Sequence, residues 1–299
     1  MKKKLLSLAL AALLAASSAV GASAATFSDT AGHWAESAIE RWSGYGVING
    51  YNGRFMPNDK ITRGEMAVIL DKLMGYQVAA ENTFHDLKAG MYYTEPILKA
   101  NAAGAMNGDG KGGVRPTANI TRQEAAVLIA NALGVGKSSS RLTFSDAASV
   151  ASWAYGYVAA LADRGIVSGE TFRPAAAITR AEVVTMLDNA ISLYAPEARV
   201  YSSFSTFEDV VVRGGGTQLV KATVMRDLIL TEGVGDGAIK LSGVKVFGRL
   251  IIRGGSEIVL NQCQIGSVVN TCGAEIVETN DPVVDPGAIG TAGTSVNGG

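Results

Sequence analysis

The sequence predicts two architectures in one chain of 299 residues: a mostly α-helical part built from three repeats, followed by an all-β module. Three observations lead to this division. A common pattern recurs three times, and its arginines Arg63, Arg122 and Arg180 mark the period. From about Ser202 onward, short apolar runs alternate with glycine-rich breaks. Glycine is also unusually frequent, at 36 residues, which indicates close packing or unusual backbone conformations.

Composition and charge exclude several classes of protein. Hydrophobic residues make up 47% of the chain, so a sizeable core is expected and global disorder is excluded. The net charge of −1 gives no basis for binding nucleic acid by bulk electrostatics. With two histidines and two cysteines, the chain cannot build a zinc finger or a multi-disulfide scaffold. We therefore expect no metal site, no cofactor and no nucleic-acid partner.

Residues 1–24 are typical of a secretory signal peptide. Three lysines precede an apolar run from Leu5 to Val20, and Ala22-Ser23-Ala24 is a small-residue cleavage site. The apolar run is too short and too rich in alanine and serine for a membrane span, and no later run reaches spanning length. The sequence therefore predicts an exported protein that is not inserted in the membrane after cleavage.

Each repeat is expected to form a helix, a loop and a second helix. The three repeats are assigned to residues 26–80, 83–137 and 143–195. The first helix of repeat 1 is expected to bury one apolar face, formed by Trp34, Ala38, Ile39, Trp42 and Tyr45. The second helix of each repeat should begin at a capping box, in which a threonine hydroxyl and a glutamate three residues later satisfy each other's backbone amides. These boxes are Thr62–Glu65, Thr121–Glu124 and Thr179–Glu182.

An arginine follows the threonine in every box. Arg63, Arg122 and Arg180 thus lie in a first helical turn, where the helix dipole disfavours a cation. One interpretation is a receptor for a carboxylate or phosphate, formed by the guanidinium and the free amides of the helix start. The other is a buried ion pair with an acid of a neighbouring repeat. The two uses are compatible with each other.

Aromatic and acidic residues recur in register with these arginines. The aromatic residues are interpreted either as core packing or as platforms that stack on sugar rings; they are Trp34, Tyr92 and Trp153. The acidic residues are interpreted either as helix caps and loop braces or as ligand contacts; they are Asp29, Asp86 and Asp146.

The three repeats resemble S-layer homology domains in their usual tandem of three. The resemblance rests on the Phe-x-Asp openings, on His33-Trp34-Ala35, on the Phe/Val-x-Pro turns and on the Ile-Thr-Arg-x-Glu boxes. It implies a three-pronged, mostly helical pseudo-trimer at the bacterial cell wall or surface layer. Its inter-repeat grooves would bind secondary cell-wall polysaccharide, often bearing a pyruvate ketal. Carried over by position, the groove residues are Arg63, Arg122, Arg180, Trp34, Trp153, Asp29, Asp86, Asp146, Gly50, Gly108 and Gly169, with Tyr92 as the aromatic of repeat 2.

Residues 202–280 are expected to form a β-rich module, followed by a flexible tail at 281–299. Short apolar runs with glycine corners favour a parallel β-helix or solenoid, with a β-sandwich as the alternative. The pattern resembles short β-helical modules attached to exported S-layer homology proteins. Cys263 and Cys272 are compatible either with a disulfide or with small fillers of successive coils.

The sequence as a whole predicts a non-enzymatic surface protein anchored by its repeats. The acids of the β-rich module form no catalytic pair by spacing, and the module contains no histidine, so no catalytic residue is assigned. The rival class is a wall-anchored polysaccharide-active enzyme with its site in the β module. Self-association of the β module in a surface layer is a further alternative.

Overall fold

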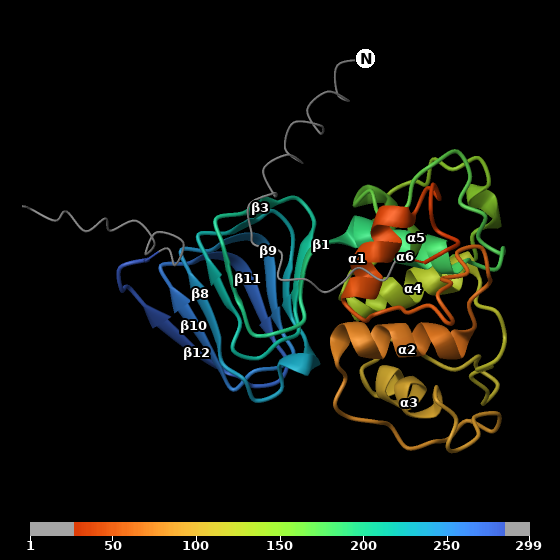
Figure 1. The fold of residues 1–299 in the computed structure, drawn as a ribbon, viewed down its shortest axis with the longest axis horizontal. Coiled ribbons are helices and arrows are strands. Elements are labelled where there is room, and N and C mark those ends of the chain that lie inside the picture. Colours follow the sequence, from red (N-terminus) through yellow and green to blue (C-terminus); the bar gives the residue numbers. More distant parts are fainter. Residues whose placement is uncertain (1–26, 285–299) are drawn as a thin grey trace, which may run out of the picture.

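The computed structural model describes residues 27–284, in which a helical part and an all-β part lie side by side (Figure 1). The expected signal peptide at 1–24 and most of the expected tail lie outside the described residues. The predicted fold class is confirmed: repeated helix pairs are followed by a β-solenoid of parallel strands.

Each repeat contributes two α-helices, as the sequence predicts. Repeat 3 also contains a short 3₁₀ turn, η2 (Ala147–Ser149). The helices are α1 (Glu36–Gly44) and α2 (Arg63–Met74) in repeat 1, α3 (Thr94–Ala102) and α4 (Arg122–Ala132) in repeat 2, and α5 (Ser152–Asp163) and α6 (Arg180–Ala190) in repeat 3. All three capping boxes are present, with each threonine hydroxyl accepting from the glutamate amide and each glutamate carboxylate accepting from the threonine amide. The boxes therefore fix where α2, α4 and α6 begin.

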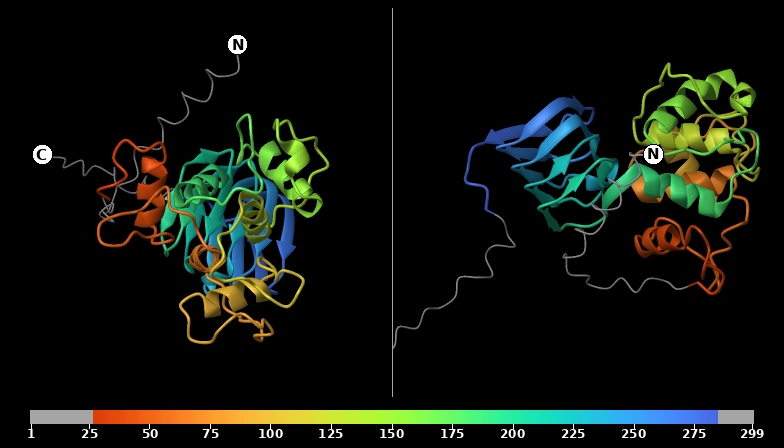
Figure 2. Two further views of the ribbon diagram at one scale, coloured as in Figure 1. Left: turned by 90° about the vertical axis from the view of Figure 1, so that its right-hand side faces the viewer. Right: turned by 90° about the horizontal axis from the view of Figure 1, so that it is seen from above.

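Three backbone hydrogen bonds close the repeats into a ring. The amide of Ile61 donates to the carbonyl of Ile178, Ile178 donates to Ile120, and Ile120 donates to Ile61, at 3.2, 3.1 and 3.0 Å. All three isoleucine side chains are fully buried at the centre. Figure 2 (left) shows the three repeats as lobes around this common centre. The arrangement is a pseudo-threefold assembly within one chain.

Helices of different repeats pack against each other around the ring. The first helix of each repeat contacts the second helix of the repeat before it, so that α3 packs on α2, α5 on α4 and α1 on α6. The last of these contacts joins repeat 1 to repeat 3. The indole Nε1 of Trp42 in α1 donates to Asp188 in α6 at 3.0 Å, and the Trp42 ring is fully buried. The first and last repeats are thereby joined directly.

The all-β part is a solenoid of about five turns, in which every strand pair is parallel. Val200 pairs with Gln218 and Ile258 with Ile276, so these coils take 18 residues each. A β-sandwich is excluded by this parallel stacking. The 3₁₀ turn η3 (Glu232–Val234) lies in a longer coil. The strands are β1 (Ile191–Ala195), β2 (Val200–Ser202), β3 (Ser205–Thr206), β4 (Asp209–Val212), β5 (Gln218–Val220), β6 (Thr223–Val224), β7 (Leu228–Leu230), β8 (Ile239–Ser242), β9 (Lys245–Ile252), β10 (Glu257–Asn261), β11 (Gln264–Asn270) and β12 (Glu275–Thr279).

Two details of the solenoid differ from the sequence-based expectations. Its first strand, β1, begins at Ile191, directly after α6, whereas the sequence places the β-rich module from 202. Of the two interpretations of Cys263 and Cys272, the disulfide is not formed, and both are free thiols on either side of β11. Cys263 is half-buried and donates to the carbonyl of Leu241, which fits the alternative role as a filler.

The outer face of one solenoid sheet forms part of the helical core. Val211, Ile229 and Ile251 occupy the same position in β4, β7 and β9, and their buried side chains belong to the core cluster of the helices. Their chain neighbours point inward and form a second, separate core inside the coils. The solenoid is therefore packed against the helical part through these apolar side chains.

The C-terminal ends of the long helices meet polar groups of this sheet. The hydroxyl of Tyr194 donates to the carbonyls of Lys72 and Leu73, the last turn of α2, at 3.2 and 3.1 Å. Arg253 donates to Ala132 at the end of α4, at 2.6 Å. Helix C-termini carry partial negative charge and unsatisfied carbonyls, so a hydroxyl and a guanidinium complement them. The third long helix, α6, runs directly into β1.

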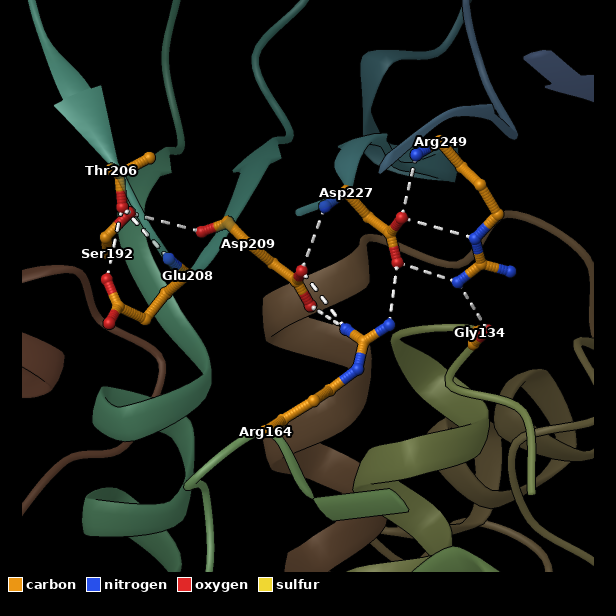
Figure 3. Close-up of polar contacts among 8 residues, drawn as sticks. All are labelled: Gly134, Arg164, Ser192, Thr206, Glu208, Asp209, Asp227 and Arg249. Carbon is orange, nitrogen blue, oxygen red and sulfur yellow. Dashed lines mark hydrogen bonds and ion pairs between the residues drawn. The ribbon is translucent and has the colours of Figure 1, made fainter. Parts of the chain in front are cut away.

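An ion cluster reinforces the junction (Figure 3). Arg164, at the end of α5, donates to both carboxylate oxygens of Asp209 at 3.2 and 3.1 Å and to Asp227 at 3.1 Å. Arg249 pairs with Asp227 at 2.7 Å and also donates to the carbonyl of Gly134 at 2.9 Å. Burial raises the pKa of the Asp209 carboxyl to about 6 although Arg164 lies beside it. This cluster joins repeats 2 and 3 to three successive coils.

Replacing Arg164 by alanine should lower the free energy of unfolding by about 3 kcal/mol at pH 7.5, because the buried Asp209 loses its compensating cation. Folding raises the pKa of Asp209. The stabilising contribution of this group is therefore fully present at pH values below its pKa in the unfolded chain, and it is lost as the pH rises through about 6. The deficit of Arg164→Ala should therefore be smaller at pH 4.5 than at pH 7.5. Chemical denaturation at both pH values measures it.

The matched control is Arg199→Ala, since Arg199 pairs with Glu197 in an exposed position and should contribute little. Adding Asp209→Asn to Arg164→Ala should restore part of the lost stability. Equal stabilities of Arg164→Ala and Arg199→Ala would contradict the role given to this cluster.

Candidate functional site: the grooves between repeats

Two grooves open between the repeats, and each is lined by residues of all three. Groove A measures 630 Å³ and groove B 220 Å³. Groove A combines Arg63 of repeat 1 with Trp153 of repeat 3 and with a wall from repeat 2: Asn107, Gly108, Asp109, Gly110, Lys111, Arg115, Glu124, Val127, Leu128 and Asn131. Groove B combines Arg122 of repeat 2 with Trp34 of repeat 1 and with a wall from repeat 3: Ile166, Val167, Ser168, Arg173, Glu182, Thr185, Met186 and Asn189.

The ring places an equivalent set of residues at a third position, which is called groove C only because its residues correspond to those of grooves A and B. It comprises Arg180 of repeat 3, Met56 and Glu65 of repeat 1, and Tyr92 of repeat 2. Arg180 reaches the loop of repeat 1, where it donates to the carbonyls of Asn49 and Phe55 at 2.6 and 2.9 Å. Tyr92 lies beside Glu65, whose negative charge contributes to raising the pKa of the phenol after the larger effect of burial. All the predicted arginines and aromatic residues thus belong to three cyclically related sets.

The motif arginines lie at the floor of the grooves, each reaching into the next repeat. Arg63 begins α2, where its amide donates to Ala118 of repeat 2. Its guanidinium donates to the carbonyls of Val114 and Asn107 at 2.8 and 3.0 Å and lies 3.4 Å from Glu124. Burial lowers the pKa of Arg63. The side chain therefore both braces the neighbouring loop and adds positive charge to groove A.

Arg122 is held less completely than the other two. Its Nη1 lies 3.5 Å from Glu182, and its guanidinium lies over the ring of Phe172 at 5.4 Å. Its Nε is buried without a hydrogen-bond partner. Arg63 and Arg122 thus show the predicted pairing with an acid of the next repeat. The Nε of Arg122 is thus an unsatisfied donor in the wall of groove B.

The capping glutamates have a second role in the grooves. One carboxylate oxygen of Glu124 accepts from Thr121, while the other lies 2.6 Å from Arg115 and 3.4 Å from Arg63. Burial raises the Glu124 pKa, but the bonds from Thr121 and Arg115 outweigh it, so the pKa lies below its ordinary value. Glu182 has the same contacts with Thr179 and Arg173. Each glutamate therefore stays ionised between two arginines.

The aromatic residues are exposed at the groove rims. The exposed fractions are 66% for Trp34, 65% for Tyr92 and 50% for Trp153. Trp34 lies before the start of α1, so its assignment to the buried face of that helix was wrong; Ala38, Ile39 and Trp42 do form that face. Of the two interpretations of these aromatic residues, core packing is excluded. Exposed rings next to cations are suited to stacking on a ligand.

The three aspartates brace the turns that form the groove walls. Asp29 accepts from the amides of Phe55 and Met56, Asp86 from Val114 and Arg115, and Asp146 from Phe172 and Arg173, at 2.6 to 2.9 Å. The bond from Phe172 is the main cause that lowers the pKa of Asp146. The structure thus places these carboxylates behind the turns.

The predicted glycines allow close backbone approach in the same loops. A Cβ on Gly50 would lie 2.2 Å from the carbonyl oxygen of Arg54, and one on Gly108 would lie 2.8 Å from that of Gly113. Gly169 has a φ of +119°, which disfavours other residues. Gly108 lines groove A itself. These glycines let the loop fold tightly against the arginine that enters from the preceding repeat.

Comparison with known proteins agrees with this geometry. The S-layer homology family matches residues 26–67, 83–126 and 143–184, which include the Ile-Thr-Arg-x-Glu boxes of all three repeats. The repeats are three S-layer homology domains. Among curated relatives, an amylopullulanase of Thermoanaerobacterium thermosulfurigenes is 32% identical over 54% of this chain and 9% of its own length. The surface-layer 125 kDa protein of Lysinibacillus sphaericus is 29% identical over 61% of this chain and 16% of its own length.

A cellulosome-anchoring protein of Acetivibrio thermocellus is 32% identical over 48% of this chain and 35% of its own length. The chain therefore spans well under two thirds of the length of these relatives. The S-layer homology domains and the surface-layer relatives indicate a secreted protein located at the cell wall. Within residues 27–284, no helix has the length and apolar character needed to span a membrane.

Sequence reasoning missed Arg115 and Arg173, which line grooves A and B. Both precede the proline of a Phe/Val-x-Pro turn, and both have positive φ angles of 51° and 58°. The sequence did contain a signal for these residues, because arginine recurs at the middle position of the Phe/Val-x-Pro turns of repeats 2 and 3. Its meaning depended on knowing that this turn faces the arginine of another S-layer homology repeat.

Replacing Asp146 by asparagine should lower the midpoint of thermal unfolding at pH 7 by roughly 2–4 °C, because a charged acceptor of two amides is lost. Folding lowers the pKa of Asp146. The stabilising contribution of this carboxylate is therefore present at pH values above its pKa in the unfolded chain, and it disappears as the pH falls through its pKa in the folded protein. The two proteins should therefore converge once the pH falls below the folded-state pKa of Asp146. Calorimetry at several pH values tests this, and a difference independent of pH would contradict it.

Proposed function

We propose that this chain attaches a secreted protein non-covalently to the bacterial cell wall by binding secondary cell-wall polysaccharide in the grooves between its S-layer homology repeats. The observation that carries the proposal is the composition of the grooves. In groove A, Arg63, Arg115 and the exposed ring of Trp153 face one cavity although they come from three repeats. Groove B repeats this set with Arg122, Arg173 and Trp34.

The chemistry of these grooves suits an acidic sugar. Guanidinium groups bind carboxylates through charge-assisted hydrogen bonds, and exposed aromatic rings stack on the apolar faces of sugar rings. A pyruvate ketal on the polysaccharide would supply such a carboxylate. The surface-layer 125 kDa protein and the cellulosome-anchoring protein among the relatives support an anchoring role. Pyruvate recognition is our proposal for this chain.

The proposal assigns a structural or display role, and no catalysis, to the solenoid. Its buried carboxylates Asp209 and Asp227 are bound by Arg164 and Arg249, which suits a structural ion cluster. Glycosidic cleavage would require two carboxyl groups that flank a substrate. Incubating the purified chain with wall and plant polysaccharides and measuring new reducing ends tests this point. Release of sugars would instead support a wall-anchored enzyme.

The double variant Trp34→Ala/Trp153→Ala should lower the affinity for purified cell walls by at least about tenfold, since each ring is available for stacking in a separate groove. Cosedimentation with walls measures the change. Because both side chains are largely exposed, the midpoint of thermal unfolding should stay nearly unchanged. These variants are preferable to Arg63→Ala, which would also remove hydrogen bonds that hold a loop.

The matched control is Phe247→Ala, which removes an exposed aromatic ring from the solenoid. It should leave wall binding intact. Unchanged binding by the tryptophan double variant, or equal losses in both proteins, would refute groove binding. A parallel assay with walls from which pyruvate has been chemically removed tests the ketal itself.

A further inference from the structure

The three grooves differ in charge at one equivalent position. The residue before the turn proline is Met56 in groove C, Arg115 in groove A and Arg173 in groove B. All three adopt the left-handed backbone region, with φ of 59°, 51° and 58°. An aspartate braces each of the three turns through the same pair of amide hydrogen bonds. The backbone at this position is therefore equivalent in the three repeats, and what differs there is the side chain.

In grooves A and B this arginine compensates the capping glutamate. Arg115 lies 2.6 Å from Glu124, and Arg173 pairs in the same way with Glu182. The motif arginine of the preceding repeat lies 3.4 or 3.5 Å from the same glutamate oxygen. Two guanidiniums thus share one carboxylate in each groove. The three groups together carry a charge of +1.

Groove C lacks this excess of positive charge. Arg180 interacts electrostatically with Glu65, Asp59 and Asp29, and Met56 adds no charge. The guanidinium of Arg180 also lies 4.7 Å from the centre of the Phe55 ring and donates to two carbonyls. A carboxylate entering groove C would therefore approach Glu65 without a second cation at the turn position, since Arg54 in the same loop is paired with Asp29 at 3.5 Å.

We infer that grooves A and B are the sites that bind an acidic sugar, that Arg115 and Arg173 determine this competence, and that groove C binds such a ligand poorly because Met56 replaces the arginine. This inference rests on the proposed function. It adds which grooves bind the acidic sugar and which residues determine that binding. One side of each of these arginines is already paired, yet their exposed fractions of 44% and 56% leave donors open to a ligand.

The test is calorimetric titration of the full chain with short acidic polysaccharide fragments released from purified cell walls. The wild type should bind two fragments per chain. Arg115→Met and Arg173→Met should each weaken one site by at least about tenfold, leaving one strong site. Met56→Arg should create a third site, because the equivalent turns already hold arginine at the same φ.

Two further variants separate charge from other effects. Tyr92→Trp gives groove C the tryptophan of the other grooves without adding charge, and it should leave two strong sites. Arg141→Met removes an exposed arginine that lines neither groove A nor groove B, and it should bind as the wild type does. Thermal unfolding of every variant establishes that it is folded.

The outcomes distinguish this inference from the proposed function. Three equal sites in the wild type, no gain in Met56→Arg, or a third site created by Tyr92→Trp alone would overturn the inference and leave wall binding in place. Absence of any binding by the wild type would overturn both. The inference would be supported by two binding sites in the wild type, one in Arg115→Met or Arg173→Met, and three in Met56→Arg.

Discussion

The ring of hydrogen bonds among Ile61, Ile120 and Ile178 is the constraint on which the grooves depend. Each of these residues directly precedes the threonine of a capping box, so the ring sets where α2, α4 and α6 begin relative to one another. It thereby places each motif arginine against the loop of the next repeat. An isolated repeat has no partner for these amides or for the exposed side of its helices, and three repeats are the smallest number that closes this ring.

The helical part was predictable to the extent that local chemistry determines it. Thr62–Glu65 and its two equivalents determine helix starts by contacts within four residues, and these starts were read correctly from the sequence. The exposure of Trp34 was not predicted correctly. The helical spacing of apolar residues extends to Trp34, although this residue precedes the first residue of α1. Its exposure follows from the packing of α1 on α6, which joins residues at opposite ends of the repeat region.

The solenoid was likewise recognisable from its short apolar runs, whereas its docking surface was not. Val211 and Ile229 alternate with inward-facing neighbours, and both sets of positions are apolar. Such runs indicate burial on two faces without showing what covers the outer one. Arg164 gave no sequence signal either, because its acidic partners lie in strands far along the chain. The groove charges were missed for the same reason: Arg115 acquires its meaning only through Arg63 of another repeat.

The orientation of the long helices has a mechanical consequence. Each of α2, α4 and α6 has its N-terminus at a groove arginine and its C-terminus at the solenoid, and α2 is about 18 Å long. A load applied by a polymer held in the grooves would be transmitted along three roughly parallel struts into a stack of hydrogen-bonded coils. The load would be shared between the apolar surface, the ion cluster around Arg164 and the covalent connection from α6 to β1. Such a joint would distribute the load over many contacts, whereas a linker of flexible residues would transmit tension through one chain alone.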